Sequence, residues 1–154
     1  MPKPYIPNDK WSRKAQKEGY RARSVYKLME LDEKFRLLKK GMSVLDLGAA
    51  PGSWLQYTAK RVGANGSILG IDLQEIEPIE GVETIQTDIA TFEPTETYDL
   101  ILSDLAPKTT GILDIDQWRS IELCQQVIEL AKRSLKPKGK LVMKVFRGSD
   151  YEDF

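Results

Sequence analysis

The amino-acid sequence predicts an α/β domain, in which a mostly parallel sheet is covered by helices on both faces. Short apolar segments alternate with longer amphipathic segments, as strands alternate with helices in such domains. The strand candidates are nearly continuous runs of apolar residues, which is typical of strands buried on both faces. Acidic residues follow several of these runs, at the sheet edge where ligands bind in parallel folds.

The first 20 residues are expected to be irregular, because prolines cluster at their start. A helix is predicted from Arg23 to about Leu37, where apolar residues recur at helical spacing. Ser24 is its candidate N-cap, and Gly41 lies just beyond its end.

Five strands are predicted after this helix. Turn-forming residues separate them from the intervening helices, notably Gly66, Gly81 and the sequence Pro137-Lys138-Gly139. The strands are expected near residues 43–47, 67–71, 82–86, 98–103 and 140–146. Helices are expected near 53–62 and 117–135, with shorter or irregular links near 73–80 and 88–92.

Composition limits the possible functions. The 154 residues fit one domain, and a hydrophobic content of 41% is sufficient for a core. We expect no membrane span or signal peptide, and the single cysteine, Cys124, is expected to be a small core residue in a reducing, cytoplasmic protein. The chain has no histidine, which excludes Ser-His-Asp and Cys-His nucleophiles and the common zinc sites.

The charge is unevenly distributed, although the net charge is zero. Residues 1–40 contain 12 lysines and arginines against 5 acidic residues, and the remainder has the opposite excess. Basic and aromatic side chains alternate there: Lys10, Trp11, Arg13, Lys14, Lys17, Tyr20, Arg21, Arg23 and Tyr26. We therefore expect a single domain over 1–154 whose basic N-terminal arm and helix contact RNA, the alternative being a solvated arm.

The stretch DLGAAPGSW, from Asp46 to Trp54, joins the first predicted strand to a helix through a glycine-bearing turn. Small residues let the backbone approach a ligand, and the helix N-terminus offers free N–H groups, as in nucleoside cofactor sites. The turn lacks the G-x-G-x-x-G pattern of dinucleotide sites, and Asp46 at its entrance repels a pyrophosphate. This carboxylate favours a cationic ligand such as S-adenosylmethionine.

Two further acidic residues extend this predicted site. Asp72 closes the second strand, where a carboxylate can accept hydrogen bonds from ribose hydroxyls. Asp88 follows the third strand and is placed to receive an adenine amino group. Each acid alone has an alternative as a strand-end or helix-capping residue, but their order along successive strands predicts a cofactor site.

A lysine and an aspartate predict a reaction centre. Asp104 follows the apolar strand at 98–103, and Lys144 lies within the apolar segment 140–146. Burial of an unpaired ammonium is costly, and such lysines often have a perturbed pKa. We expect Lys144 to pair with Asp104, with Lys27 as a third candidate; the alternative is a lysine that reaches solvent or forms a simple ion pair.

Taken together, these motifs resemble those of the FtsJ-type ribosomal RNA 2′-O-ribose methyltransferases, in the same order along nearly the whole chain. The matching segments are RSVYKL at 23–28, DLGAAPGSW at 46–54, SDLAP at 103–107 and VMKVF at 142–146. The resemblance implies a Rossmann-like methyltransferase fold, S-adenosylmethionine as the methyl donor, and a uridine in large-subunit ribosomal RNA as the substrate. We further expect a monomer without membrane association.

The resemblance also implies roles for individual residues. The family has a catalytic Lys-Asp-Lys-Glu tetrad, whose first three members correspond to Lys27, Asp104 and Lys144. Its cofactor positions correspond to Gly52, Trp54, Asp72, Asp88 and Asp104. The turn itself adds Asp46 and Gly48 to the predicted cofactor site, and no metal site is predicted.

The chain departs from the family pattern at two places. Ser53 stands where the family usually has glycine. The fourth tetrad member, a glutamate in a later strand, has no counterpart, because Glu152 lies too close to Lys144. The segment 140–146 also lacks a later strand to cover its apolar edge, which invites aggregation. We therefore expect a longer protein with at least two more strands.

Alternative functions stay open on the sequence alone. A transfer RNA 2′-O-methyltransferase shares the same core, and a non-catalytic RNA-binding module can retain the cofactor pocket. A small-molecule methyltransferase leaves the basic N-terminal segment without a purpose, and the turn disfavours a nicotinamide dehydrogenase. The segment 112–116, after Lys108-Thr109-Thr110-Gly111, is expected to be a mobile loop beside the site that shapes substrate choice.

Overall fold

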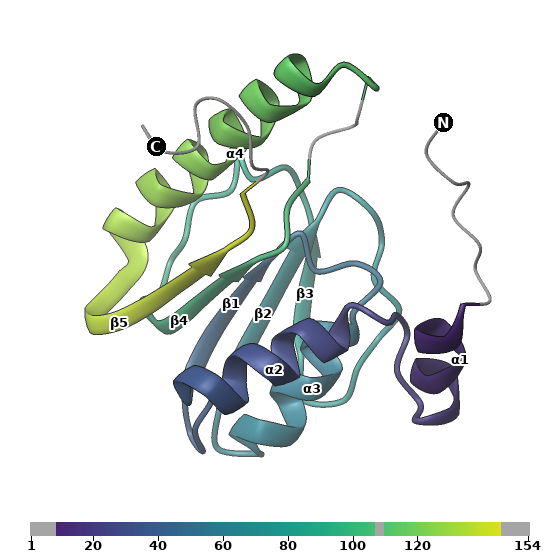
Figure 1. Cartoon of the computed structure of the whole chain (residues 1–154). Coiled ribbons are helices and arrows are strands. Elements are labelled where there is room, and N and C mark those ends of the chain that lie inside the picture. The colour runs from purple at the N-terminus through teal and green to yellow at the C-terminus, as the bar shows by residue number, and fades with distance from the viewer. Residues whose placement is uncertain (1–8, 107–109, 146–154) are drawn as a thin grey trace.

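The computed structural model describes residues 9–106 and 110–145. Within these ranges, five strands form one sheet in the order β3-β2-β1-β4-β5, and every neighbouring pair is parallel (Figure 1). The strands are β1 (Ser43–Leu47), β2 (Ser67–Asp72), β3 (Glu83–Gln86), β4 (Tyr98–Ser103) and β5 (Leu135–Met143). The predicted parallel α/β fold is confirmed.

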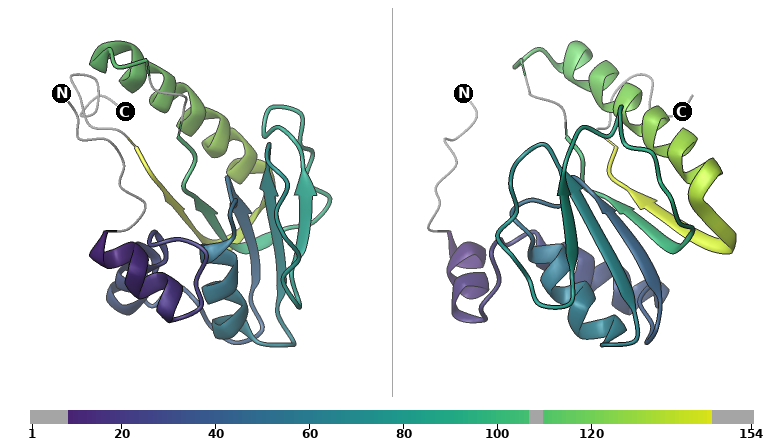
Figure 2. Two further views of the ribbon diagram at one scale, coloured as in Figure 1. Left: turned by 90° about the vertical axis from the view of Figure 1, so that its right-hand side faces the viewer. Right: turned by 180° about the vertical axis from the view of Figure 1, so that it is seen from behind.

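Helices cover both faces of this sheet, as predicted (Figures 1 and 2). The covering helices are α2 (Val25–Phe35) and α3 (Ser53–Val62) on one face and α4 (Leu113–Ser134) on the other, whereas α1 (Lys10–Lys17) contacts α2. Adjacent residues of a strand point to opposite faces, so Val44 of β1 packs with α2 and α3, whereas Leu45 packs with α4. Both faces are therefore apolar, which explains the continuous apolar runs. No helix in the described ranges is long and apolar enough to span a bilayer.

The register of the strands brings their C-terminal ends to one edge of the sheet. Leu47, the last residue of β1, pairs with Ile71 of β2 and with Ser103 of β4. Asp72 and Asp104 are the next residues after these partners, so both acids lie beside the turn that follows β1. We call this edge the rim.

The expectation of an irregular N-terminus is wrong for residues 10–17, which form α1. Asp9 caps this helix, because its carboxylate accepts a hydrogen bond from the Ser12 backbone N–H at 2.7 Å. Ala15 is the helix's one buried residue, so α1 has almost no apolar periodicity to detect. The prolines of the first eight residues lie outside the described ranges.

The predicted mobile loop at 112–116 is wrong for residues 113–116, which form the first turn of α4. The Asp116 carboxylate fixes the preceding segment, because it accepts hydrogen bonds from the Thr110 N–H, the Thr110 hydroxyl and the Gly111 N–H. Lys108 and Thr109 lie outside the described ranges. The helix signal was missed because apolar residues of this first turn are exposed rather than packed.

The last described strand also differs from its prediction, because β5 begins at Leu135 rather than near residue 140. Its pairing with β4 is irregular between Tyr98 and Leu100, which lets the turn-forming Pro137-Lys138-Gly139 sequence lie within the strand. Residue 146, the end of the predicted strand, lies outside the described ranges.

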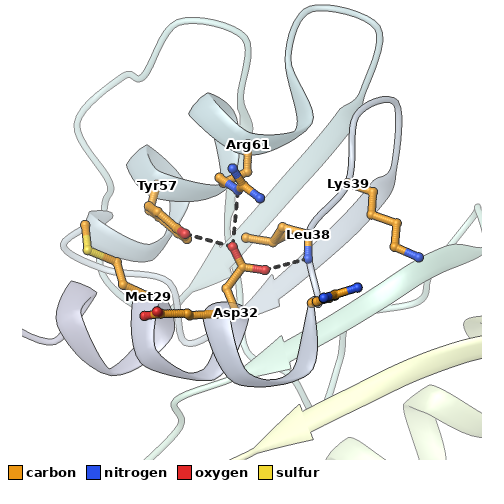
Figure 3. A pocket seen from close by; sticks show the side chains of 8 residues that line it. Met29, Asp32, Leu38, Lys39, Tyr57 and Arg61 are labelled. Atoms are coloured by element: carbon orange, nitrogen blue, oxygen red, sulfur yellow. Dashed lines mark hydrogen bonds and ion pairs between the residues drawn. The ribbon is translucent and has the colours of Figure 1, made fainter.

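A buried carboxylate joins the end of α2 to α3 (Figure 3). Asp32 accepts hydrogen bonds from the Leu38 N–H at 2.9 Å and the Tyr57 hydroxyl at 2.7 Å, and pairs with Arg61 at 3.2 Å. Burial, together with the hydrogen bond to Asp32, raises the pKa of Tyr57 to about 12, so the phenol stays a proton donor. These groups line a concavity of about 610 Å³. Because its carboxylate is satisfied by the protein, we assign this concavity a structural role.

Replacing Asp32 therefore destabilises the fold. The substitution Asp32→Asn removes the charge that holds Arg61 and leaves one of the two neutral donors without a good acceptor. We expect it to lower the free energy of unfolding by about 2 kcal/mol in urea titrations, whereas Glu33→Gln, at an exposed neighbouring acid, changes it by less than about 0.5 kcal/mol. Equal stability of the two variants would contradict this role.

Candidate functional site

The turn after β1 is held against the end of β2. Gly48 and Gly52 have φ values of 73° and 116°, which favour glycine. The Gly48 and Ala49 N–H groups donate to the Ile71 carbonyl, and the Ala50 N–H donates to the Asp72 carboxylate at 3.0 Å. The turn therefore has a fixed shape.

Asp72 connects this turn to the link that follows β2. One of its carboxylate oxygens accepts from Ala50, and the other accepts from the Gln74 N–H at 2.8 Å. Asp72 thus has a positioning role that the sequence did not predict, while each oxygen keeps a further lone pair for a ligand hydroxyl. The ribose contact stays a prediction.

The start of α2 is locked onto the start of α3. The Trp54 indole N–H donates to the Ser24 carbonyl at 2.9 Å, and the Ser24 and Ser53 hydroxyl oxygens lie 3.0 Å apart. The prediction that Ser24 caps α2 is wrong: it occupies the N-cap position, but its hydroxyl bonds to Ser53 instead. Ser53 is buried, and this partner satisfies the hydroxyl that the family's glycine would lack.

Arg21 fastens the turn to the link after β2. Its guanidinium donates to the Pro51 carbonyl at 3.0 Å, the Glu77 carbonyl at 2.8 Å and the Pro78 carbonyl at 3.1 Å. We had expected Arg21 to belong to the RNA-contacting charges, but its guanidinium is engaged within the protein. This contact cannot be predicted from the sequence, because the three carbonyls lie 30 to 57 residues away.

An inner cavity lies between the turn and β4. It has a volume of about 10 Å³, and its lining includes four predicted cofactor residues, Asp46, Gly48, Trp54 and Asp104. The remaining lining residues are Ser24, Ala49, Ala50 and Ser53.

Asp46 has the most unusual environment of the residues that line this cavity. It is 1% exposed, and neither carboxylate oxygen has a hydrogen-bond partner in the described part of the chain. Burial raises the pKa of Asp46 well above its usual range, and the nearby charges of Asp104 and Asp72 raise it further. A buried, unsatisfied acid is costly for the fold, so it indicates a site that a ligand completes.

An outer pocket of about 490 Å³ adjoins the inner cavity. All three predicted catalytic residues, Lys27, Asp104 and Lys144, contribute to its walls. The other lining residues are Trp11, Arg23, Ser24, Tyr26 and Glu30. Asp104 and Ser24 line both spaces and form the wall between them.

The predicted pairing of Lys144 with Asp104 is present, with 3.1 Å between Nζ and Oδ1. The expectation that Lys144 is buried inside a strand is wrong: it lies one residue beyond β5, and its side chain is 40% exposed. Its N–H still donates to the Ser103 carbonyl, and its carbonyl accepts from the Cys124 thiol at 3.1 Å. These contacts place the side chain at the rim. Cys124 is buried in α4, as predicted.

The remaining predicted residues lie around these spaces. Lys27 forms an exposed ion pair with Glu30, with 3.7 Å between the charged atoms. Asp88 lies beyond β3, and its carboxylate accepts a hydrogen bond from the Ala90 N–H. A side chain at Gly52 would meet Arg21 at 3.0 Å, which shows how closely the backbone is approached there. Among the described residues, no group of acidic or cysteine side chains is arranged to hold a metal ion.

The carboxylates at the inner cavity fit a cationic cofactor better than an anionic one. Asp46 offers two unsatisfied oxygens at the inner cavity, and Asp104 lies in the same lining. The side chain of Leu105 lies against Gly48, since a Cβ added there would lie 2.7 Å from Leu105 Cδ2. The inner cavity as it stands holds about one water molecule.

Comparisons with known proteins identify the family and the fold of this chain. A family model described as FtsJ-like methyltransferase matches residues 20–154. The ribosomal RNA large subunit methyltransferase E of Azoarcus sp. (strain BH72) is 45% identical, with 96% of this chain and 76% of the relative covered. The protein of that name from Methanothrix thermoacetophila is also 45% identical, with 95% and 60% covered. A crystal structure of a ribosomal RNA methyltransferase from Plasmodium falciparum superimposes with a TM-score of 0.80 at 31% identity, covering 87% of this chain and 82% of that one.

Replacing Asp46 separates stability from ligand binding. The folded pKa of Asp46 lies above its unfolded value near 3.9, so its contribution to stability is present below that value and is lost as the pH rises toward the folded pKa. We expect Asp46→Asn, without ligand, to gain stability relative to the unsubstituted protein by about 1.4 kcal/mol for each pH unit in that window. Urea unfolding between pH 4 and 7 measures this difference. The same variant should bind a cationic methyl donor more weakly. Parallel stability curves would show that Asp46 is not held in its neutral form.

Replacing Arg21 tests the contact between the turn and the link after β2. A lysine cannot reach three carbonyls in two segments with one ammonium, so Arg21→Lys loosens the cofactor side of the rim. We expect its affinity for S-adenosylmethionine to fall about 5- to 10-fold in calorimetric titrations. Arg13→Lys, at an exposed position of α1, is the matched control. An unchanged affinity in Arg21→Lys would remove this residue from the cofactor site.

Proposed function

The chain belongs to the FtsJ-like methyltransferase family, and we propose that it transfers a methyl group from S-adenosylmethionine to a ribose 2′-hydroxyl in RNA. One observation carries this proposal: the Lys144–Asp104 pair lines an outer pocket whose wall is shared with the cavity of the buried Asp46. A site for a cationic donor and a site for a hydroxyl acceptor thus adjoin. The relatives named ribosomal RNA large subunit methyltransferase E favour large-subunit ribosomal RNA as the target, and the uridine is the nucleotide that the motif resemblance implies.

The cofactor side of the rim is assigned to the acids and the turn. S-adenosylmethionine, when bound, supplies a methyl group activated by a sulfonium. A bound cation favours the ionised form of Asp46, so this side chain then supplies the complementary charge through two oxygens that have no other partner among the described residues. Gly48 and Gly52 keep the backbone of the turn accessible, and Trp54 holds the turn in place. Asp72 and Asp88 follow β2 and β3, where they suit the ribose and the adenine.

The acceptor side is assigned to Lys144 and its neighbours. Lys144 orients the 2′-hydroxyl, and in its neutral amine form it accepts the hydroxyl proton at Nζ as the oxygen gains the methyl group. Asp104 fixes the position of that side chain through the 3.1 Å contact. Lys27 lines the same pocket and supplies positive charge for the RNA phosphates. Because the donor is already activated, the main task of these residues is alignment.

The RNA-binding face is assigned to α1 and the start of α2. Lys10 and Lys14 are exposed on α1, which places two ammonium groups beside the outer pocket. Little acidic charge neutralises these two lysines. The exposed Glu18 contacts Lys14 at 3.9 Å. A methyltransferase that acts on a small molecule would not need the positive charge of these lysines.

Replacing Lys144 tests this function. We expect Lys144→Ala to lower the rate of methyl transfer to unmethylated ribosomal RNA by at least about 100-fold, because both alignment and proton removal are lost. Its affinity for S-adenosylmethionine should stay within about 2-fold, since the cofactor residues are retained. Lys132→Ala, an exposed lysine of α4 that pairs with Glu129, is the control. Transfer of labelled methyl groups measures the rate, and near-normal turnover of Lys144→Ala would overturn the assignment.

A further inference from the structure

We propose that Trp11 is the platform on which the base of the target nucleotide stacks while its ribose lies at Lys144. This inference rests on the proposed function, and it assigns a residue that decides how the substrate is held. Trp11 comes from α1, whereas Asp104 and Lys144 follow β4 and β5, yet all three line the outer pocket. Asp104 and Lys144 thus form the reactive wall of the pocket, and Trp11 contributes an aromatic wall.

Several contacts hold α1 in the position that creates this aromatic wall. The Asp9 carboxylate caps α1 and pairs with Arg23, just before α2. The Tyr26 hydroxyl of α2 donates to the Glu18 carboxylate at 2.8 Å, at the other end of α1. Burial, with this hydrogen bond, raises the pKa of Tyr26 to about 12, so the contact persists at neutral pH. Helix α1 is therefore fixed beside the pocket at both of its ends.

The ring of Trp11 packs against a neighbouring aromatic ring and stays half-exposed. It packs on Tyr26, with 5.6 Å between the ring centroids and 53° between their planes. The residue is nevertheless 47% exposed. A rigid, half-exposed indole is the feature that proteins use to stack an unpaired base, and it accepts any base because every base has a π-face.

Positive charge surrounds this ring and suits the phosphates on either side of a stacked nucleotide. The ammonium groups of Lys10 and Lys14 each lie 5.5 Å from the Trp11 ring centroid. Lys14 also lies 4.8 Å from the Tyr26 ring centroid. Both lysines have flexible stems that can move from the ring to a phosphate without disturbing α1.

The other exposed tryptophan lacks this setting and provides a matched control. Trp118 of α4 is 60% exposed, beside the exposed Leu113 and Ile115. Asp114 and Asp116 precede it in the same helix and Arg119 follows it, so Trp118 lacks the pair of lysines that lies beside Trp11. An anionic strand is therefore attracted more strongly to Trp11 than to Trp118.

A comparison of RNA with and without bases tests the proposal. The probes are a hexamer of uridine and a ribose-phosphate hexamer of equal length without nucleobases, each followed by fluorescence anisotropy. The unsubstituted protein should bind the uridine hexamer roughly 5- to 100-fold more tightly than the baseless strand. Trp11→Ala should lose this preference and keep its affinity for the baseless strand, whereas Trp11→Phe should keep part of the preference. Trp118→Ala should behave as the unsubstituted protein does.

Methyl transfer to large ribosomal subunits from cells that lack the enzyme gives the second measurement. We expect Trp11→Ala to raise the KM for this substrate roughly as much as it weakens uridine binding. A preference for bases that survives Trp11→Ala, or that is missing in the unsubstituted protein, overturns the stacking role. So does a variant that is impaired on subunits but normal on the uridine hexamer, since Trp11 then contacts a protein. If the protein prefers bases in a manner that depends on Trp11 but transfers no methyl group, this inference is supported and only the proposed function is overturned.

Discussion

The parallel pairing of β1 with both β2 and β4 is the constraint on which the whole site depends. Because β1 lies at the centre of the sheet, its C-terminal end meets those of its two neighbours at one level. The turn that follows β1 consequently lies between Asp72 and Asp104, which come from segments 26 and 58 residues after Asp46. A shift of one residue in either pairing would turn the alternating core residues toward the wrong faces, so packing of the core fixes the site as well.

The strands and α3 were predictable because burial on both faces leaves a pattern in the sequence. Val44 and Leu45 must both be apolar, since one packs under α2 and α3 and the other under α4. The first turn of α4 and the whole of α1 were missed for the opposite reason. They bury few apolar side chains, and polar contacts such as Asp9 with Ser12 and Asp116 with Thr110 fix them instead. Such contacts depend on geometry that periodicity does not encode.

Some residues of the candidate site were likewise predictable from the sequence, and others were not. The acids at the strand ends were predictable, because the position of a strand end follows from the apolar runs. The roles of the basic residues were not predictable, because a side chain that contacts RNA and one that stabilises the fold cannot be distinguished in a sequence. Arg21 serves the fold, because carbonyl groups far along the chain converge on its guanidinium. Lys10 and Lys14 lie on an exposed helix and keep their ammonium groups near the outer pocket.

Asp104 links the two halves of the site electrostatically. Its carboxylate contacts Lys144 in the outer pocket and also raises the pKa of Asp46 behind it. A cation entering the inner cavity favours the ionised form of Asp46, and the added negative charge then acts on Asp104 and its lysine partner. Under the proposed function, Asp104 therefore lies between the space for the methyl donor and the space for the hydroxyl acceptor, because it lines both.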